Sequence, residues 1–197
     1  VADCREFLVA MLDKTKETDW PDWSGWSTAV HGLSQWHKNA FDPAIQKTNL
    51  LHPYEAVKQI VSVLDDDTII CADGGEASIW ADMAAYSKNP GQFMTHGYLG
   101  CLGIGMPFAI GAQVANPDKR VVVITGDGSV GFNIQEFDTM VTHNLPIITI
   151  VLNNKAWGMC VHSQQSMYGD NRLVVTTLAD ARYEQVAQGF GAQGEYI

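Results

Sequence analysis

Basic clusters, paired cysteines and long apolar runs are all scarce in this 197-residue sequence. Charged residues make up only 17% of it, and 22 acidic side chains against 12 basic ones give a formal net charge of −10. Because no group of Lys and Arg offsets that charge, we exclude nucleic acid as a partner. No run of 18 apolar residues is present, so we expect no membrane-spanning helix and no membrane partner.

The cysteines are few and scattered. Cys4, Cys71, Cys101 and Cys160 form neither a CxxC pair nor a metal-binding spacing. We therefore expect isolated thiols, buried or incidental, in a reducing compartment, which predicts a cytoplasmic protein. The first residues carry acids and precede no apolar run, so they do not read as a signal peptide. Apolar residues are abundant, at 46%, which predicts a globular chain with a substantial core.

Two segments are expected, with a boundary near Asn49. Residues 3–16 carry apolar positions at helical spacing. The indoles that follow indicate a linker that packs them on the domain surface: Trp20, Trp23, Trp26 and Trp36. Residues 1–48 are therefore a preceding piece with its linker, and residues 49–197 are the main domain. The chain stops where a further strand is due, so we expect a fragment truncated at its C-terminal end.

The main domain alternates between two kinds of pattern. Short apolar runs predict buried strands at residues 68–72, 120–125 and 146–152. Helical patterns lie between them, at residues 53–64, 77–86, 106–115 (a buried helix) and 134–143. This alternation predicts a doubly wound parallel α/β sheet of about six strands in three α/β/α layers. Ligands of such sheets bind at the carboxyl ends of the strands.

Polar residues follow two of the predicted strands. Gly126, Asp127 and Gly128 end one, and Asn153 and Asn154 end the next. Between them lie 24 residues, enough for one helix and one strand, so Asp127 and an asparagine should lie side by side. Carboxylate and amide oxygens suit Mg²⁺, which also accepts phosphate oxygens. The glycines let backbone approach a diphosphate, and a helix opening after Ser129 would direct free N–H groups at it.

A nucleotide-binding oxidoreductase domain is the competing interpretation. GDGSVG after a strand satisfies the dinucleotide pattern GxGxxG. A nicotinamide site would place an acidic residue at the end of the next strand, where this chain has Asn153 and Asn154. An aspartate between the first two glycines would also repel a bare pyrophosphate. Both departures favour a diphosphate bridged by metal.

The stretch from GDGSVG to LNN resembles the diphosphate-binding motif of thiamine-diphosphate enzymes. HGYLGCLGIGMPFAIGAQVA and NNKAWGMCVHSQQ are similar to the benzaldehyde lyase and acetolactate synthase branch, over roughly residues 50–195. Residues 1–48 resemble the end of the family's middle domain. The resemblance implies thiamine diphosphate and Mg²⁺ as cofactors. It implies Asp127, Asn154 and the carbonyl of Ala156 as metal ligands.

The same resemblance implies a wider set of cofactor-contacting residues. They comprise Asp73, Gly74, Gly75, Glu76, Ala77, Gly100, Leu102, Gly126, Gly128, Ser129, Trp157 and Gly158. Gly100 is expected to accept a hydrogen bond from the cofactor's amino group, and Leu102 to hold the cofactor bent from below. For Leu102 the alternative is core packing. Trp157 and His162 follow the second asparagine, and for them we favour packing and a surface role. His96 is expected either to meet the substrate or to be a structural histidine. Ser78 stands where benzaldehyde lyase has an active-site tyrosine. This difference argues against specificity for aryl aldehydes.

The implied activity is that of a C–C bond lyase or carboligase on 2-keto acids, 2-hydroxy ketones or aldehydes. Acetolactate-synthase-like or acyl-CoA lyase or decarboxylase activity is the alternative, and a non-catalytic cofactor-binding module is another. The family's activating glutamate belongs to a pyrimidine-binding domain, which we do not find in this chain. Glu76 and Glu136 are not expected to replace it, because Glu76 belongs to the phosphate turn and Glu136 to the helix after the Asp127 turn. The implied partners are that domain, a small carbonyl substrate, and further copies in a homodimer or homotetramer.

Overall fold

The computed structural model describes residues 3–40, 50–85 and 87–197. The chain divides into two compact units, Val1–Lys47 and Thr48–Ile197. Asn49, where the sequence predicts a boundary, lies outside the described residues, and so does Tyr86 at the end of the helix predicted over 77–86.

The first unit contains two helices, α1 (Cys4–Thr15) and α2 (Ser24–Ala40). The Asp3 carboxylate caps α1 by accepting hydrogen bonds from the backbone N–H groups of Arg5 and Glu6. From Ser24 onward the tryptophan segment is helical, which the sequence did not predict. The four indoles are between 56% and 68% exposed.

The second unit is built on a parallel sheet, which confirms the predicted α/β class. Its strands are β1 (Ile69–Ala72), β2 (Phe93–Met94), β3 (Val121–Gly126) and β4 (Ile148–Leu152), in the order β2-β1-β3-β4. The prediction of about six strands is wrong for the described residues, which form four. Residues 190–197 form no strand, and β4 is therefore an edge strand whose side chains are only partly buried.

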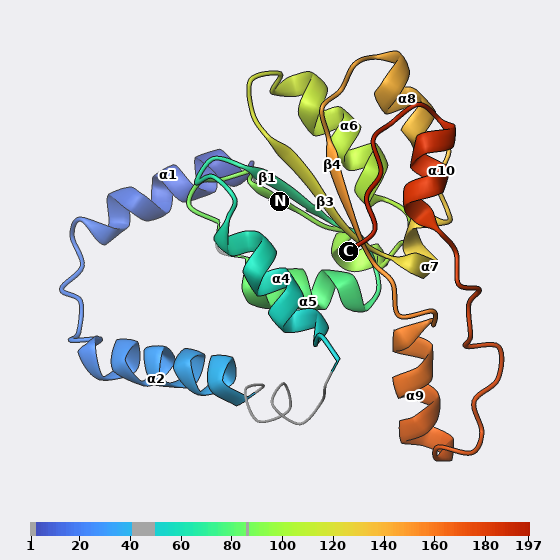
Figure 1. The fold of residues 1–197 in the computed structure, drawn as a ribbon. Coiled ribbons are helices and arrows are strands. Elements are labelled where there is room, and N and C mark those ends of the chain that lie inside the picture. The colour runs from blue at the N-terminus through green and yellow to red at the C-terminus, as the bar shows by residue number, and fades with distance from the viewer. Residues whose placement is uncertain (1–2, 41–49, 86) are drawn as a thin grey trace. The chain divides into compact units, whose positions relative to one another are not determined.

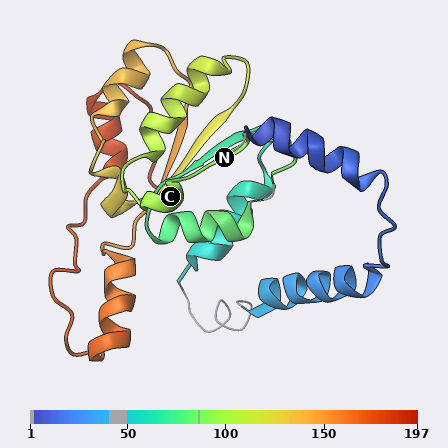
Figure 2. The same cartoon turned by 180° about the vertical axis from the view of Figure 1, so that it is seen from behind.

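Helices cover both faces of this sheet (Figures 1 and 2). On one face lie α4 (Pro53–Ser62) and α5 (Glu76–Ala84), and on the other α6 (Gly105–Ala115), α8 (Glu136–Thr142) and α10 (Tyr183–Gly189). Side chains along each strand point alternately to the two faces of the sheet, as the two-residue period of a strand requires. Cys71 and Val123 pack toward α6, whereas Ile70 and Val122 pack toward α4 and α5. The sheet is thus buried on both sides.

Helix α6 corrects one expectation. Its sequence predicts a buried helix, yet only one side is buried, through Met106 and Ala109. Phe108 and Val114 on the other side are 40% and 66% exposed. The described part of α6 therefore presents an apolar face to its surroundings.

The turns at the carboxyl ends of the strands share one edge of the sheet because the strands are parallel. After β2 comes the short helix η1 (Gly97–Leu99), after β3 comes α7 (Asp127–Val130), and after β4 comes α9 (Gly158–Tyr168). The helix expected after Ser129 begins at Asp127 instead, since Gly126 is the last extended residue.

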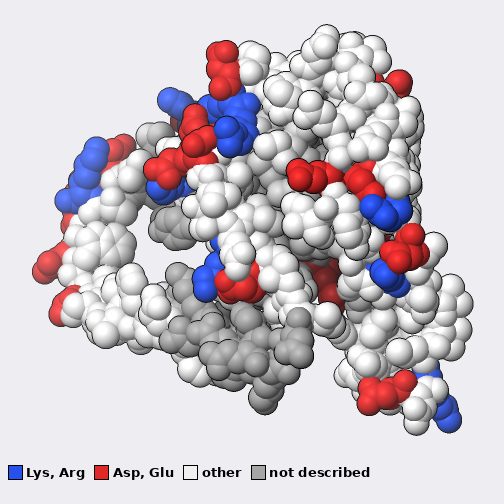
Figure 3. Space-filling view, viewed as in Figure 1, with Lys and Arg blue, Asp and Glu red and all other residues white. Residues whose placement is uncertain are grey.

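Charged side chains are sparse over much of the face seen in Figure 3. Figure 3 shows acidic and basic groups scattered over the visible face, with broad uncharged areas between them. None of the helices in the described ranges is long and apolar enough to cross a membrane.

Candidate functional site

Asp127 is the first residue after β3 and is only 4% exposed. Its carboxylate accepts hydrogen bonds from the backbone N–H groups of Gly128 (2.9 Å) and Ala156 (3.2 Å). Burial raises the pKa of Asp127, and these N–H donors offset part of that rise. Among the ion pairs of the described residues, none involves Asp127. A buried carboxylate without a cationic side chain is suited to a bound metal ion.

Asn154 lies beside Asp127, on the loop that follows the neighbouring strand β4. Its side-chain oxygen accepts a hydrogen bond from the Ala156 N–H at 3.1 Å, the same group that Asp127 contacts. Two oxygens within reach of one N–H are necessarily close neighbours. The arrangement follows from the pairing of Gly126 with Leu152, which places the two strand ends level. The structure thus brings the Asp127 carboxylate and the Asn154 amide oxygen together at the backbone N–H of Ala156.

Three glycines allow the turns to pack tightly around this point. A Cβ atom on Gly74 would lie less than 3.0 Å from the Cys101 carbonyl. The same atom on Gly128 would meet the Trp157 ring, and on Gly158 the Glu76 carboxylate. A larger residue at any of these positions would force the turns apart. The predicted role of glycine here, close approach of the backbone, therefore has a geometric basis.

Asp73 joins the turns rather than facing solvent. One carboxylate oxygen accepts hydrogen bonds from the N–H groups of Gly74 (2.8 Å), Gly103 (2.8 Å) and Ile104 (3.1 Å). The other accepts the Thr125 hydroxyl at 2.9 Å. With the residue 1% exposed, its side chain is fully engaged within the protein. Any contact of Asp73 with a ligand would therefore have to come from its backbone.

Ser129 ties the β3 turn to the β1 turn, since its hydroxyl donates to the Gly74 carbonyl at 2.9 Å. Gly75, with φ +82, is the N-cap residue before α5, and Ala77 is buried in that helix. Leu102 is partly buried, and its Cδ2 lies 3.6 Å from where a Cβ of Gly75 would be. Ser129 and Leu102 therefore both contact the β1 turn.

Glu76 pairs with His162, which lies on α9. The Glu76 side chain is 16% exposed and that of His162 is 65% exposed. The pair ties the start of α5 to α9, the helix that follows the loop at residues 153–157. The sequence predicts Glu76 in the phosphate turn and His162 at the surface. The pairing carries no sequence signal, because the two residues are 86 positions apart.

His96 and Ser78 contact one another at the edge of the site. The His96 Nδ1 lies 2.8 Å from the Gly97 carbonyl, and its Nε2 lies 3.2 Å from the Ser78 hydroxyl. Because a carbonyl only accepts, Nδ1 carries a proton in this arrangement. Both ring nitrogens of His96 therefore have partners within the protein.

An apolar surface borders the same turn. Gly100 adopts the left-handed conformation with φ +64 at the end of η1. The side chains just before it, Tyr98 and Leu99, are fully exposed at 103% and 81%. Phe132, 57% exposed, makes an edge-to-face ring contact with Trp157, which lies on the loop after β4. Large apolar groups that are this exposed typically mark a contact surface.

Tyr183 belongs to the site although the sequence did not indicate it. Its hydroxyl donates to the backbone carbonyl of Asp127 at 3.0 Å, from the first turn of α10. Burial raises the pKa of Tyr183, and the Asp127 charge adds to that rise. The two residues are 56 positions apart, so no local pattern links them.

Comparisons with known proteins agree on one class. Residues 73–197 match the thiamine pyrophosphate enzyme C-terminal TPP-binding domain. The acetolactate synthase isozyme 1 large subunit of Escherichia coli is 34% identical over 168 residues, covering 81% of this chain and 30% of that protein. The 2-hydroxyacyl-CoA lyase 2 of Caenorhabditis elegans is 37% identical over 147 residues, covering 75% and 23%. A probable acetolactate synthase of Mycobacterium bovis is 33% identical over 147 residues, covering 75% and 27%. The chain thus spans about a quarter of these relatives' length.

Proposed function

Because the chain belongs to the thiamine pyrophosphate enzyme family, through its C-terminal cofactor-binding domain, we propose that it supplies the diphosphate and Mg²⁺ half of a C–C lyase or carboligase active site. The observation that carries this proposal is the buried carboxylate of Asp127, which pairs with no cationic side chain among the described residues and lies beside the Asn154 amide oxygen. Both oxygens accept from one N–H group, which supports their acting together on a single ion.

The residues present fit thiamine diphosphate and Mg²⁺. Asp127 and Asn154 offer hard oxygen donors, and we propose the Ala156 carbonyl as a third. The diphosphate would lie along Gly128 and Ser129 and the turn at Gly74, where glycine lets the backbone come close. When bound, the cofactor supplies the carbanion chemistry by which a C–C bond next to a carbonyl is broken or formed.

We propose three further roles at this site. Leu102, which packs on the β1 turn, would limit the shapes that a bound cofactor can adopt. The Gly100 carbonyl would accept a hydrogen bond from the cofactor's amino group. His96 would face the substrate, with its ring held by Ser78 and the Gly97 carbonyl. For Glu76, pairing with His162 supports a structural role and not that of the activating glutamate.

We propose a 2-keto acid, 2-hydroxy ketone or aldehyde as the substrate class, with acetolactate-synthase-like or acyl-CoA lyase activity as the alternative. The names of the relatives support both. A pyrimidine-binding domain and further copies of the protein are the proposed partners, and the exposed Tyr98 and Leu99 support a covering domain. The four thiols, all free, support a cytoplasmic location.

Substitution of Asp127 tests the metal site. Asp127→Asn keeps the shape of the side chain but removes the only charged ligand, so Mg²⁺-dependent binding of thiamine diphosphate should be lost. Calorimetry on the complete protein gives the affinity, and Asp170→Asn, an exposed carboxylate outside the site, is the matched control. Micromolar affinity retained by Asp127→Asn would refute the assignment.

The two other classes remain testable with the same protein. A nucleotide-binding oxidoreductase would be stabilised thermally by NAD and not by thiamine diphosphate with Mg²⁺. A non-catalytic module would bind the cofactor yet show no C–C cleavage of benzoin or pyruvate, even after a pyrimidine-binding domain is added. Turnover restored by that domain would exclude the module. Without the domain we expect this chain to be catalytically silent.

A further inference from the structure

We propose that residues 176–183, called here the bracing segment, hold the two halves of the metal site at a fixed separation, and that Tyr183 is the positioning residue for Asp127. This inference rests on the proposed function, because it assigns a role toward the metal that Asp127 and Asn154 would bind. It concerns residues that do not themselves touch the metal.

The first half of the site is the turn that begins at Asp127. Tyr183 reaches its backbone with a hydrogen bond of 3.0 Å from the hydroxyl to the Asp127 carbonyl. The aromatic ring packs against the core on the α6 side of the sheet. A ring fixed by packing places its hydroxyl at one point, so the bond restrains the Asp127 backbone and, through it, the carboxylate.

The second half is the loop at residues 153–157, which the bracing segment pairs with as a short antiparallel bridge. The Trp157 N–H donates to the Thr176 carbonyl and the Leu178 N–H donates to the Lys155 carbonyl, both at 2.8 Å. Lys155, between the ligands Asn154 and Ala156, has φ +59, a conformation that costs a non-glycine residue energy. The two backbone bonds hold the loop in this conformation.

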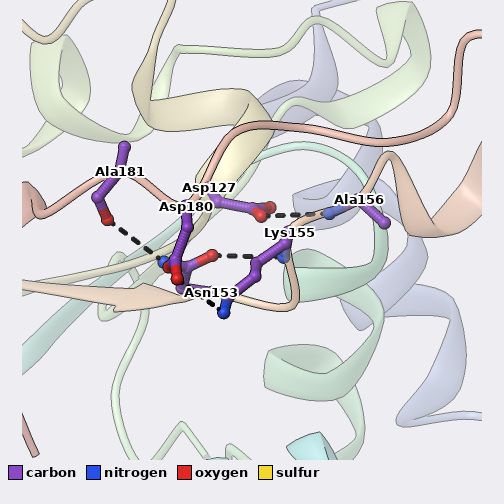
Figure 4. A network of polar contacts seen from close by, with 6 residues as sticks. All are labelled: Asp127, Asn153, Lys155, Ala156, Asp180 and Ala181. Carbon is purple, nitrogen blue, oxygen red and sulfur yellow. Dashed lines mark hydrogen bonds and ion pairs between the residues drawn. The ribbon is translucent and has the colours of Figure 1, made fainter.

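Side chains add two more links between the same segments, as Figure 4 shows. The Asn153 amide donates to the Ala181 carbonyl at 3.4 Å, and the Lys155 ammonium lies 2.7 Å from the Asp180 carboxylate. The ion pair is exposed and contributes little stability by itself. Its effect is to fix the register of the loop against the segment.

The bracing segment therefore contacts both metal-binding turns, which come from different strands. Mg²⁺ demands near-ideal octahedral geometry at about 2.0–2.1 Å, whereas Ca²⁺ accepts irregular geometry at about 2.3–2.6 Å. Loosening Asp127 should consequently weaken Mg²⁺ binding more than Ca²⁺ binding. General destabilisation of the fold would weaken the two equally, so their ratio reports positioning.

The test is Tyr183→Phe, which removes the hydroxyl and keeps the ring. The affinities of the complete protein for Mg²⁺ and for Ca²⁺ are measured by calorimetry at saturating thiamine diphosphate. Mg²⁺ affinity should fall roughly tenfold, as is typical when a group that orients a metal ligand is lost, and the Mg²⁺/Ca²⁺ ratio should fall with it. Tyr168→Phe, at an exposed tyrosine at the end of α9, is the matched control.

Asn153→Ala provides a second variant that leaves the Tyr183 ring untouched, and it should shift the ratio in the same direction. A ratio unchanged in both variants, in protein that binds Mg²⁺ normally before substitution, would overturn the bracing role. Failure of the unsubstituted protein to bind Mg²⁺ with thiamine diphosphate would instead refute the proposed function. A ratio lowered equally by Tyr168→Phe would also overturn the inference.

Discussion

Replacing Asp73 by alanine should destabilise the fold severely, because one carboxylate satisfies donors from three segments. Three of them are backbone N–H groups, of Gly74, Gly103 and Ile104, and the fourth is the Thr125 hydroxyl. Thr125 has a second acceptor in the Gly126 carbonyl at 3.2 Å, so the alanine variant leaves three donors without partners.

The magnitude follows from the cost of each unsatisfied donor. A buried donor without an acceptor costs about 1–3 kcal/mol, so Asp73→Ala should lower the free energy of unfolding by about 4 kcal/mol. That is a large share of the roughly 5–15 kcal/mol that stabilises a typical domain. Asp73→Asn keeps one acceptor oxygen for the N–H groups, and its amide can donate to Thr125, so its cost should be about 1–2 kcal/mol.

Urea unfolding followed by tryptophan fluorescence measures both variants against the unsubstituted protein. Thr125→Val, which removes a single one of the four hydrogen bonds, is the control and should cost about 1 kcal/mol. A loss below about 1 kcal/mol for Asp73→Ala would contradict the reasoning, because it would mean that water satisfies the freed donors. Equal losses for alanine and asparagine would contradict it as well.

The remaining predictions concern packing, titration and geometry. Gly128→Ala would put a Cβ 2.5 Å from Cε3 of Trp157. It should lower the free energy of unfolding in urea by about 1–3 kcal/mol and weaken cofactor binding. Gly126→Ala is the control, because its Cβ meets nothing within 4 Å and should leave packing intact. Burial raises the pKa of the Cys71 thiol from 9.0 to about 12. As pH rises, the thiol therefore loses its proton first in the unfolded chain, and the free energy of unfolding should fall between pH 9 and 12. Urea unfolding at a series of pH values measures this fall, which should be shallower for Cys71→Ala. Leu102→Ala should lower kcat of the complete enzyme by up to about a hundredfold while cofactor affinity changes little, and unchanged kcat with weaker affinity would show that Leu102 only packs.

The sequence predicted those parts of the fold that local patterns control. The apolar runs at β1, β3 and β4 are rich in β-branched residues and are bounded by turn residues, so their positions follow from local composition. Placing Asp127 and Asn154 side by side needed only the rule that parallel strands end at one edge. Turn residues at strand ends are therefore the features that the sequence revealed best.

Contacts between distant segments were not predictable in the same way. The bond from Tyr183 to Asp127 joins α10 to the β3 turn, and no periodicity marks either partner for it. Asp73 was expected to line the diphosphate, and only the structure shows that its carboxylate is engaged by Gly103 and Thr125. The helix through Trp26 was missed because aromatic spacing there was interpreted as surface packing.

The pairing of Gly126 with Leu152 also makes cofactor binding a check on correct folding. A slip of one residue between β3 and β4 would displace one metal ligand by about 3.3 Å and turn its strand's side chains to the other face. Only the correctly paired sheet would then bind the ion, and ligand at a hundred times its Kd would favour that pairing by about 2.7 kcal/mol. Saturating cofactor would therefore favour the sheet in which β3 and β4 are correctly paired over a slipped one.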